Sequence, residues 1–140
     1  MTGIFLVLNG GDDPYQTTGV SKSGVYLRDL DSLSNADDNS DILVERAPSS
    51  ITQRLGVTMD TNWSPQCQFT DALPAASYDF FYKPFRAAVE YPDIGTRDLG
   101  YWSRPFRFSE NDIEVITYSV PLRDGAGTPY GVLGVEISAD

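Results

Sequence analysis

The last third of the chain is dominated by two β-prone runs joined by a glycine-rich connection. Residues 114–122 (EVITYSVPL) are rich in β-branched and aromatic residues, and residues 130–138 (YGVLGVEIS) alternate with a period of two. Residues 123–129 (RDGAGTP) carry the glycines and the proline typical of a hairpin connection. The two runs therefore predict an antiparallel hairpin, which any fold of this chain has to contain.

Three further segments predict strands. Residues 3–8 (GIFLVL) form an apolar run that ends at the turn-forming sequence NGGD, and residues 24–29 (GVYLRD) alternate as a half-buried strand does. We expect these two to pair with each other as a hairpin. Residues 99–106 (LGYWSRPF) are short, aromatic and broken by Pro105, which is typical of an edge strand.

Two short helices are predicted between these strands. Residues 50–56 (SITQRLG) combine a capping box with a glycine suited to a left-handed C-cap. A second helix is predicted to begin at Pro84, whose fixed φ and missing N–H suit a first helical position, and to end before Pro92. Residues 31–41, which are acidic, predict an exposed loop, and residues 57–76 predict irregular structure.

The order of these segments predicts the fold class. Two strands, then helices and loops, then three strands indicate a single α+β domain of 140 residues with a five-stranded, mainly antiparallel sheet flanked by short helices. Such a sheet can bury one face against helices and curve the other around a small ligand.

The composition argues against several classes of function. Twenty acidic and ten basic residues give a net charge of −10, which repels nucleic acids and anionic lipid surfaces. No run approaches the ~20 apolar residues of a membrane-spanning helix. The chain has no histidine, which excludes His-based triads and His-containing metal sites. We find no nucleophile elbow or paired-carboxylate motif, and we expect a protein that is not an enzyme.

The acidic segment does not match a calcium-binding loop. Asp37, Asn39 and Asp41 have the spacing of the first EF-hand ligands, but isoleucine and proline stand where the loop glycine and the closing glutamate are required. Cys67 is the only cysteine, so no internal disulfide or cysteine zinc cluster can form. We expect neither a metal nor a cofactor.

Four short motifs near the end of the chain resemble the closing strands of a Cache domain. They are ITYS at residues 116–119, PL at 121–122, DG at 124–125 and GVLGVEI at 131–137. In that family a strand ending in S-x-P-L passes through a glycine turn into G-V-x-G-x-D-I.

Upstream segments extend the resemblance over nearly the whole chain, and it is strongest over residues 98–138. GVYLRDLD at 24–31, DNSD at 38–41, KPF at 83–85 and DLGYWS at 98–103 are similar to Cache sensors attached to bacterial diguanylate cyclases. The resemblance implies a PAS-like fold.

The resemblance implies a function as well. Cache domains are extracytoplasmic sensors of membrane-anchored receptors that signal to a cytoplasmic cyclase, kinase or chemotaxis output. Family members carry a long helix before the first strand and a membrane-proximal subdomain after the last, so residues 1–140 resemble the membrane-distal subdomain alone. We expect an extracytoplasmic module that binds a small molecule and has no nucleic-acid partner. We expect it to reach the membrane only through flanking segments and to belong to a receptor able to form a homodimer.

The resemblance also implies a ligand site. Cache domains that bind amino acids use a basic–proline–aromatic–aromatic run, a Tyr-x-Asp and a final-strand aspartate. A cation would hold a ligand carboxylate, aromatic rings would form the walls, and the last acidic residue would receive an ammonium. Serine, phenylalanine and glutamate replace three of the family's residues here, so another small polar or weakly charged ligand remains open. The predicted ligand-binding residues are Tyr101, Glu136, Lys83, Arg86, Phe85, Ser103, Tyr118 and Trp102.

Plainer roles for these residues stay open. Leu133, Val135 and Ile137 share one face of the last predicted strand, and if that face points inward Glu136 lies on the solvent face. Neighbouring residues of an extended strand point to opposite faces, so one of Tyr101 and Trp102 belongs to the core, and we expect Tyr101 to face the ligand.

The other candidates have structural explanations too. Tyr118 is able simply to pack the sheet, and Arg86 to pair with Glu90 one helical turn on. The alternative function is a structural or dimerisation module of the same receptor that binds no ligand.

Overall fold

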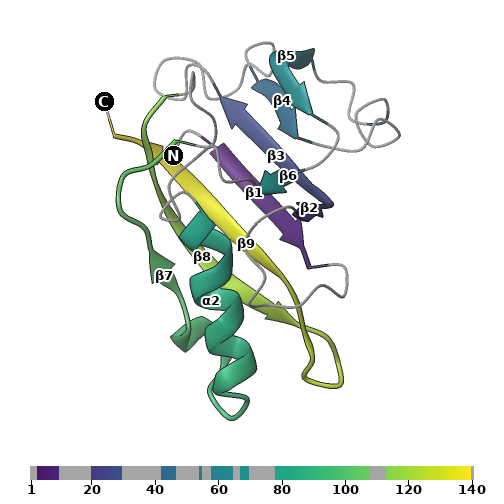
Figure 1. Cartoon of the computed structure of the whole chain (residues 1–140), viewed down its shortest axis with the longest axis vertical. Helices are drawn as coiled ribbons and strands as arrows, with labels where there is room; N and C mark the ends of the chain where they lie inside the picture. The colour runs from purple at the N-terminus through teal and green to yellow at the C-terminus, as the bar shows by residue number, and fades with distance from the viewer. Residues whose placement is uncertain are drawn as a thin grey trace.

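The computed structural model describes residues 3–9, 20–29, 42–46, 54, 58–64, 67–69, 78–107 and 113–139. The elements within them are β1 (Gly3–Leu8), β2 (Val20–Lys22), β3 (Gly24–Asp29), β4 (Ile42–Arg46), β5 (Thr58–Ser64), β6 (Cys67–Phe69), α2 (Asp79–Glu90), the 3-10 helix η2 (Thr96–Asp98), β7 (Tyr101–Trp102), β8 (Val115–Arg123) and β9 (Pro129–Ser138). Together they form an α+β fold (Figure 1).

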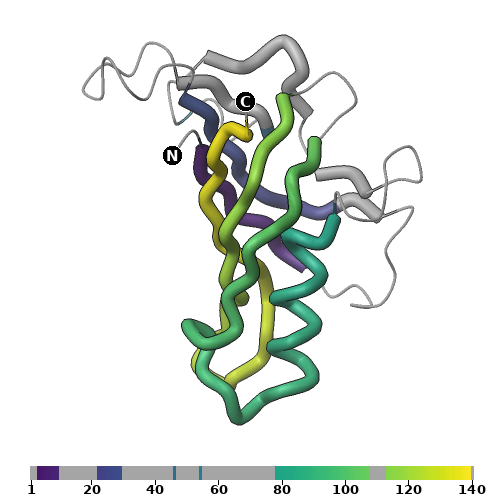
Figure 2. Tube along the Cα trace, turned by 90° about the vertical axis from the view of Figure 1, so that its left-hand side faces the viewer, coloured from purple at the N-terminus to yellow at the C-terminus, as the bar shows by residue number. Residues whose placement is uncertain are grey.

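Seven strands form one sheet in the order β5-β4-β3-β1-β9-β8-β7. Its pairs are antiparallel except that of β4 with β5, which is parallel. The helix α2 packs against β7, β8 and β9. It runs along one side of the sheet, which we call the inner face (Figure 2). The strands β2 and β6 form a separate antiparallel ribbon.

The five predicted strands are all present, and they are contiguous in the sheet as β3-β1-β9-β8-β7. The predicted pairing of the first two is confirmed, because β1 and β3 are antiparallel neighbours, and the predicted hairpin of β8 and β9 is confirmed as well. The predicted edge strand is shorter than expected. It is regular only in β7, and an isolated bridge from Phe106 to Val115 follows.

The sheet also contains two strands that the sequence patterns do not predict. β4 adds to the edge of β3, and β5 adds to β4. The prediction of irregular structure over residues 57–76 is wrong at β5 and β6. In β5 the strand-favouring threonines and tryptophan are interrupted by aspartate and asparagine, which strands disfavour, so the local pattern is ambiguous and pairing with β4 supports the strand. The predicted loop over residues 31–41, and the predicted helix over residues 50–56 apart from Arg54, lie outside the described residues.

The helix α2 begins at Asp79 and not at Pro84, so its predicted start is wrong, whereas its predicted end before Pro92 is confirmed. Proline inside a helix removes the N–H that would bond the carbonyl four positions earlier, which here belongs to Phe80. The hydroxyl of Ser119 on β8 donates to that Phe80 carbonyl oxygen at 2.7 Å. The sheet thus supplies the donor that the proline removes, and the helix continues through it.

Replacing Ser119 with alanine is expected to lower the free energy of unfolding by about 1–3 kcal/mol, because the buried Phe80 carbonyl would lose its donor. Chemical denaturation of the purified domain measures the change. The exposed Ser23, between β2 and β3, provides the matched control. Ser23→Ala should stay within about 0.5 kcal/mol of wild type. Equal losses in the two variants would contradict the role assigned to the Ser119 hydroxyl.

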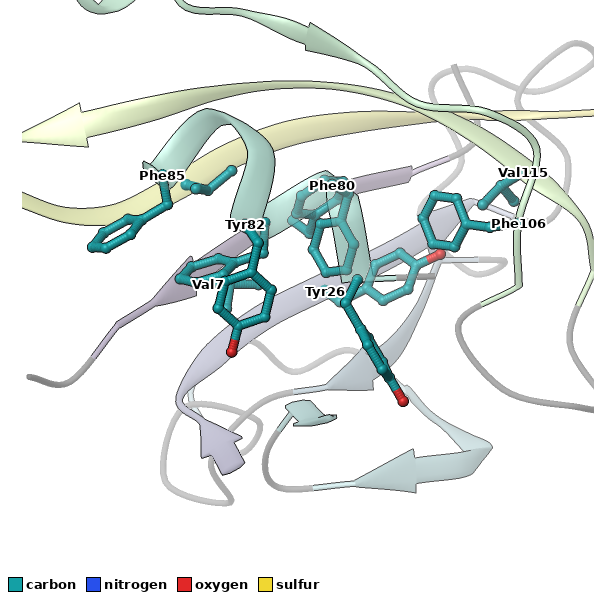
Figure 3. Close-up of a cluster of buried hydrophobic side chains, with 11 residues drawn as sticks. Val7, Tyr26, Phe80, Tyr82, Phe85, Phe106 and Val115 are labelled. Carbon is teal, nitrogen blue, oxygen red and sulfur yellow. The ribbon is translucent and has the colours of Figure 1, made fainter. Parts of the chain in front are cut away.

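Aromatic side chains fill the space between α2 and the sheet (Figure 3). Phe80 stands edge-on to Phe5 of β1, with ring centroids 5.1 Å apart, and stacks on Phe106 at 5.7 Å. Further along α2, Phe85 stacks on Phe81 at 5.2 Å. The part of the sheet that α2 covers therefore has a packed aromatic core.

The two faces of the sheet differ in character. Gly134 and Glu136 of β9 are buried on the inner face, whereas Leu133 and Ile137 are 39% and 41% exposed on the opposite, outer face. Ile4 of β1 is likewise 42% exposed on the outer face. The predicted alternation of the last strand is confirmed, but its aliphatic residues face outward and its carboxylate faces inward.

Candidate functional site

Neighbouring strands place polar residues in one line across the inner face. Arg28 of β3 lies opposite Gly3 of β1, and Gly3 lies opposite Glu136 of β9. Glu136 in turn lies opposite Thr117 of β8, whose main chain is bonded to Ser103, just beyond β7. We call Arg28, Glu136, Thr117 and Ser103 the polar row. All four side chains are buried.

A bidentate ion pair joins Arg28 to Glu136. Arg28 Nε donates to Glu136 Oε1 at 3.0 Å, and Arg28 Nη2 donates to Glu136 Oε2 at 3.1 Å. Arg28 Nη2 also donates to the phenol oxygen of Tyr26. Two parallel bonds fix the orientation of both planar groups, and the two charges cancel within the pair.

Glycine at position 3 leaves room for this pair. Arg28 and Glu136 stand on strands that are not neighbours, because β1 lies between them. A Cβ at Gly3 would lie 3.1 Å from Glu136 Oε1 and 2.8 Å from the carbonyl oxygen of Leu27. A residue with no side chain therefore allows the charged groups to meet over β1.

The two hydroxyls of the polar row differ in their bonding. Ser103 Oγ accepts from Thr117 N at 2.9 Å, and Ser103 N donates to Thr117 O at 2.9 Å. Thr117 Oγ1 is fully buried and has no hydrogen-bond partner in the part of the chain that the structure describes. An unbonded buried hydroxyl costs about 1–3 kcal/mol, so a group that bonded it would be held firmly.

Glu136 and Ser103 are the two predicted site residues that belong to the polar row. Tyr101 is half-buried on the same inner face. Burial raises the pKa of the Tyr101 phenol, the carboxylate of Asp79 raises it further, and Arg104 opposes the rise. Tyr101 is therefore an uncharged hydrogen-bonding group at neutral pH.

Trp102 and Tyr118 lie on the outer face. They stand opposite each other in β7 and β8, with ring centroids 4.9 Å apart, and Trp102 is 62% exposed. The expectation that Tyr101 and Trp102 point to opposite faces is confirmed. The sheet itself separates Trp102 and Tyr118 from Glu136.

The three predicted residues on α2 have different surroundings. Phe85 is buried in the aromatic core, and Lys83 is exposed. Arg86 is half-buried, with its guanidinium carbon 4.8 Å from the ring centroid of Tyr82. Arg28 is a cation that pairs with Glu136, and the sequence patterns did not predict this pair. The predicted role of Lys83 or Arg86, to hold a ligand carboxylate, stays a prediction.

The sequence patterns do not single out Arg28 or Thr117, nor a second buried polar pair. Lys22 Nζ donates to Asn9 Oδ1 at 2.9 Å and lies 5.0 Å from the ring centroid of Phe81. Both side chains of this pair are buried. The one signal for Arg28 was its place in the alternating run GVYLRD, and alternation does not tell which face points inward.

Neither a metal cluster nor a membrane-spanning helix is found in the described ranges. Within them, no three Cys, Asp or Glu side chains lie close enough together to hold a metal ion. Of the helices described, none has both the length and the apolar character needed to cross a bilayer.

Comparisons with protein-family models, with curated proteins and with solved structures found no match to this chain. The resemblance to Cache domains therefore rests on the motifs quoted above. What the coordinates establish is an α+β fold with a mainly antiparallel sheet. Function has to be argued from the polar row.

Proposed function

We propose that this domain is the extracytoplasmic small-molecule-sensing module of a membrane-anchored bacterial receptor, with a PAS-like Cache fold. The observation that carries the proposal is the inward orientation of Glu136, a fully buried carboxylate that is paired with Arg28 and stands opposite Thr117. Charged and hydroxyl groups directed into an otherwise aromatic interior are the means by which a domain recognises a polar ligand.

Stability alone does not explain the polar row. A buried ion pair is often no more stabilising than well-packed apolar residues of the same volume, because desolvating two charges offsets their attraction. The unbonded hydroxyl of Thr117 adds a further cost. Interior groups that break the rules of stable packing are found mainly at functional sites, which favours recognition over a purely structural role.

A thermal-shift screen of amino acids, organic acids, amines and nucleobases tests the proposal. A ligand at about 100 times its Kd should add about 2.7 kcal/mol to the free energy of unfolding. In Glu136→Gln the ligand-induced shift, measured from that variant's own midpoint, should be strongly reduced. Glu114→Gln, which changes a half-buried carboxylate outside the polar row, should retain the shift.

Two outcomes would count against a sensor. One is a broad screen that leaves the wild-type midpoint unmoved. The other is a stabilising compound whose effect is the same in Glu136→Gln as in wild type, since it would bind away from the polar row.

A second candidate function, a structural or dimerisation module, is favoured by the outer face. Ile4, Leu133 and Ile137 are exposed there and form part of an uncharged aliphatic surface. A second copy of the domain could cover this surface with its own outer face by two-fold symmetry. Each chain carries a net charge of −10, but contact between two aliphatic surfaces would not bring like charges together.

Sedimentation equilibrium tests the second candidate function. If the outer face joins two copies, the wild-type mass should rise with concentration, and Leu133→Glu should give a monomer that still shows any ligand-induced thermal shift. A wild type that is monomeric at every concentration would remove the support for the second candidate.

A further inference from the structure

Arg123, the last residue of β8, binds the end of α2 and the turn that follows it. Its Nη2 donates to the carbonyl oxygens of Ala88 and Tyr91, at 3.0 Å each, and its Nη1 donates to the carbonyl oxygen of Ile94. Arg123 Nε is buried without a hydrogen-bond partner among the described residues. The guanidinium therefore joins the sheet to three main-chain oxygens that lie 29 to 35 residues earlier in the sequence.

Two features of the helix end explain why it needs this donor. The last carbonyls of a helix have no partner within it, and the N–H that would bond Ala88 O belongs to position 92, where proline has none. The last turn of α2 also has no basic residue to balance the negative end of the helix dipole. Arg123 supplies the donor and the positive charge, much as Ser119 supplies the donor that Pro84 removes.

The turn that carries Arg123 is closed by several hydrogen bonds. Asp124 Oδ1 accepts from the main-chain N of Ala126 at 2.9 Å and of Thr128 at 3.0 Å, and Asp124 N donates to Thr128 O at 3.0 Å. Gly127 takes a positive φ of 85°, which only glycine adopts at no steric cost. The hairpin is therefore the well-fixed side of the contact.

The other side of the contact, residues 91–99, is bonded mainly to itself, and we call it the strap. Most of its side chains are exposed, Tyr91 by 53% and Ile94 by 40%. The bonds from Arg123 to Tyr91 O and Ile94 O are exposed, whereas the bond from Ser119 to Phe80 O is buried. Apart from the bond that Tyr91 N donates to Ala87 O, the main-chain bonds of the strap within the described ranges run from Ile94 N to Tyr91 O, from Asp98 N to Gly95 O and from Leu99 N to Thr96 O.

Segments with few buried apolar contacts and exposed backbone hydrogen bonds are the ones that open locally in a folded protein. We propose that Arg123 is a latch that holds the strap and the last turn of α2 on the β8–β9 hairpin. When the guanidinium releases, these residues open together, while the sheet and the first part of α2 stay folded. The aromatic core and the buried Ser119 bond hold that first part without Arg123. The latch does not depend on the proposed sensing function.

Hydrogen exchange of backbone amides tests whether the strap opens locally. It is followed by two-dimensional NMR on the 15N-labelled chain over a series of low urea concentrations. In the wild type, the amides of Ile94, Asp98 and Leu99 should have a lower opening free energy and a weaker dependence on urea than the amides that join β1 to β9, because local opening exposes little surface. Equal free energies and equal urea dependence would overturn the proposal, since the strap would then open only when the whole domain unfolds.

Three variants test the role of Arg123. Arg123→Met keeps an unbranched stem without the guanidinium and should raise the exchange rates of the strap amides about tenfold. Arg123→Lys keeps the charge but lacks the planar fork that reaches three carbonyls, so its rates should lie between those of wild type and Arg123→Met. Arg107→Met removes an exposed arginine outside the strap and should leave the strap at wild-type rates.

The outcomes that would contradict the latch are distinct. Strap exchange that is unchanged in Arg123→Met, or that rises equally in Arg107→Met, would overturn the role of Arg123. If Arg123→Met does not fold, the wild-type urea series and Arg123→Lys decide, and wild-type strap rates in Arg123→Lys would overturn it as well.

Discussion

Glu136→Gln should lower the free energy of unfolding by about 3–5 kcal/mol, the largest effect expected from a single polar substitution in this domain. The carboxylate is fully buried and accepts both bonds from Arg28. An amide in its place cannot balance the charge of the Arg28 guanidinium, which is itself buried. Urea or guanidinium denaturation followed by circular dichroism measures the loss.

A double variant separates the cost of breaking the pair from the net value of having it. Arg28→Met combined with Glu136→Leu removes both charges and should be much closer to wild type than Glu136→Gln, because no charge is left unpaired. Glu114→Gln controls for loss of a carboxylate elsewhere and should stay within about 0.5 kcal/mol. A Glu136→Gln variant as stable as this control would contradict the burial of the ion pair.

The second large effect is expected at Phe5, whose truncation to alanine should cost about 3–5 kcal/mol. Its ring packs edge-on against Phe80, with centroids 5.1 Å apart, and against Tyr26 at 6.2 Å. It also fills the space over Gly134, where an added Cβ would clash with the ring. Alanine would leave a cavity among side chains that are themselves tightly packed.

Ile4, the neighbouring residue on the outer face, is the matched control. Because it is 42% exposed, Ile4→Ala should cost about 1 kcal/mol or less at low protein concentration. A loss as large as that of Phe5→Ala would contradict the assignment of inner and outer faces in β1. A loss that appears only at high concentration would instead indicate that a second copy covers the outer face.

The strands were predictable because their signals are local. Alternation, apolar runs and turn residues placed all five predicted strands, since a period of two and a glycine-rich connection need no knowledge of the rest of the chain. β5 was not predicted because aspartate and asparagine interrupt its strand-favouring threonines and tryptophan, and its pairing with β4 cannot be read from a local pattern. The start of α2 was predicted wrongly for a related reason. Ser119, which donates to the Phe80 carbonyl in place of the N–H that Pro84 lacks, belongs to a strand distant in the sequence.

The orientation of the strands was harder to predict than their positions. Leu133 and Ile137 are the residues that usually point inward, and in β9 they point outward. The inner face takes Glu136 because Arg28, 108 residues away in the sequence, neutralises it there. The local pattern around Glu136 does not reveal Arg28 as its partner. It does not reveal either that the missing side chain at Gly3 leaves room for the two charged groups to meet. Glu136 thus has the inward orientation that the predicted site requires, whereas its ion pair with Arg28 was not predicted. The predicted contacts of Lys83 or Arg86 with a ligand carboxylate stay predictions.

The adjacency of β1 and β9 also bears on how the domain forms. β1 is hydrogen-bonded along its length to β9, with Gly3 opposite Glu136 and Leu8 opposite Gly131, so the two strands that pair lie far apart in the sequence. The β8–β9 hairpin closes a short loop and is expected to form early, whereas docking β1 onto it requires closure of a loop that contains most of the described elements. Until that step is complete, β1 lacks one of its two neighbouring strands, and the folding chain exposes an unpaired β edge of the kind that chaperones shield.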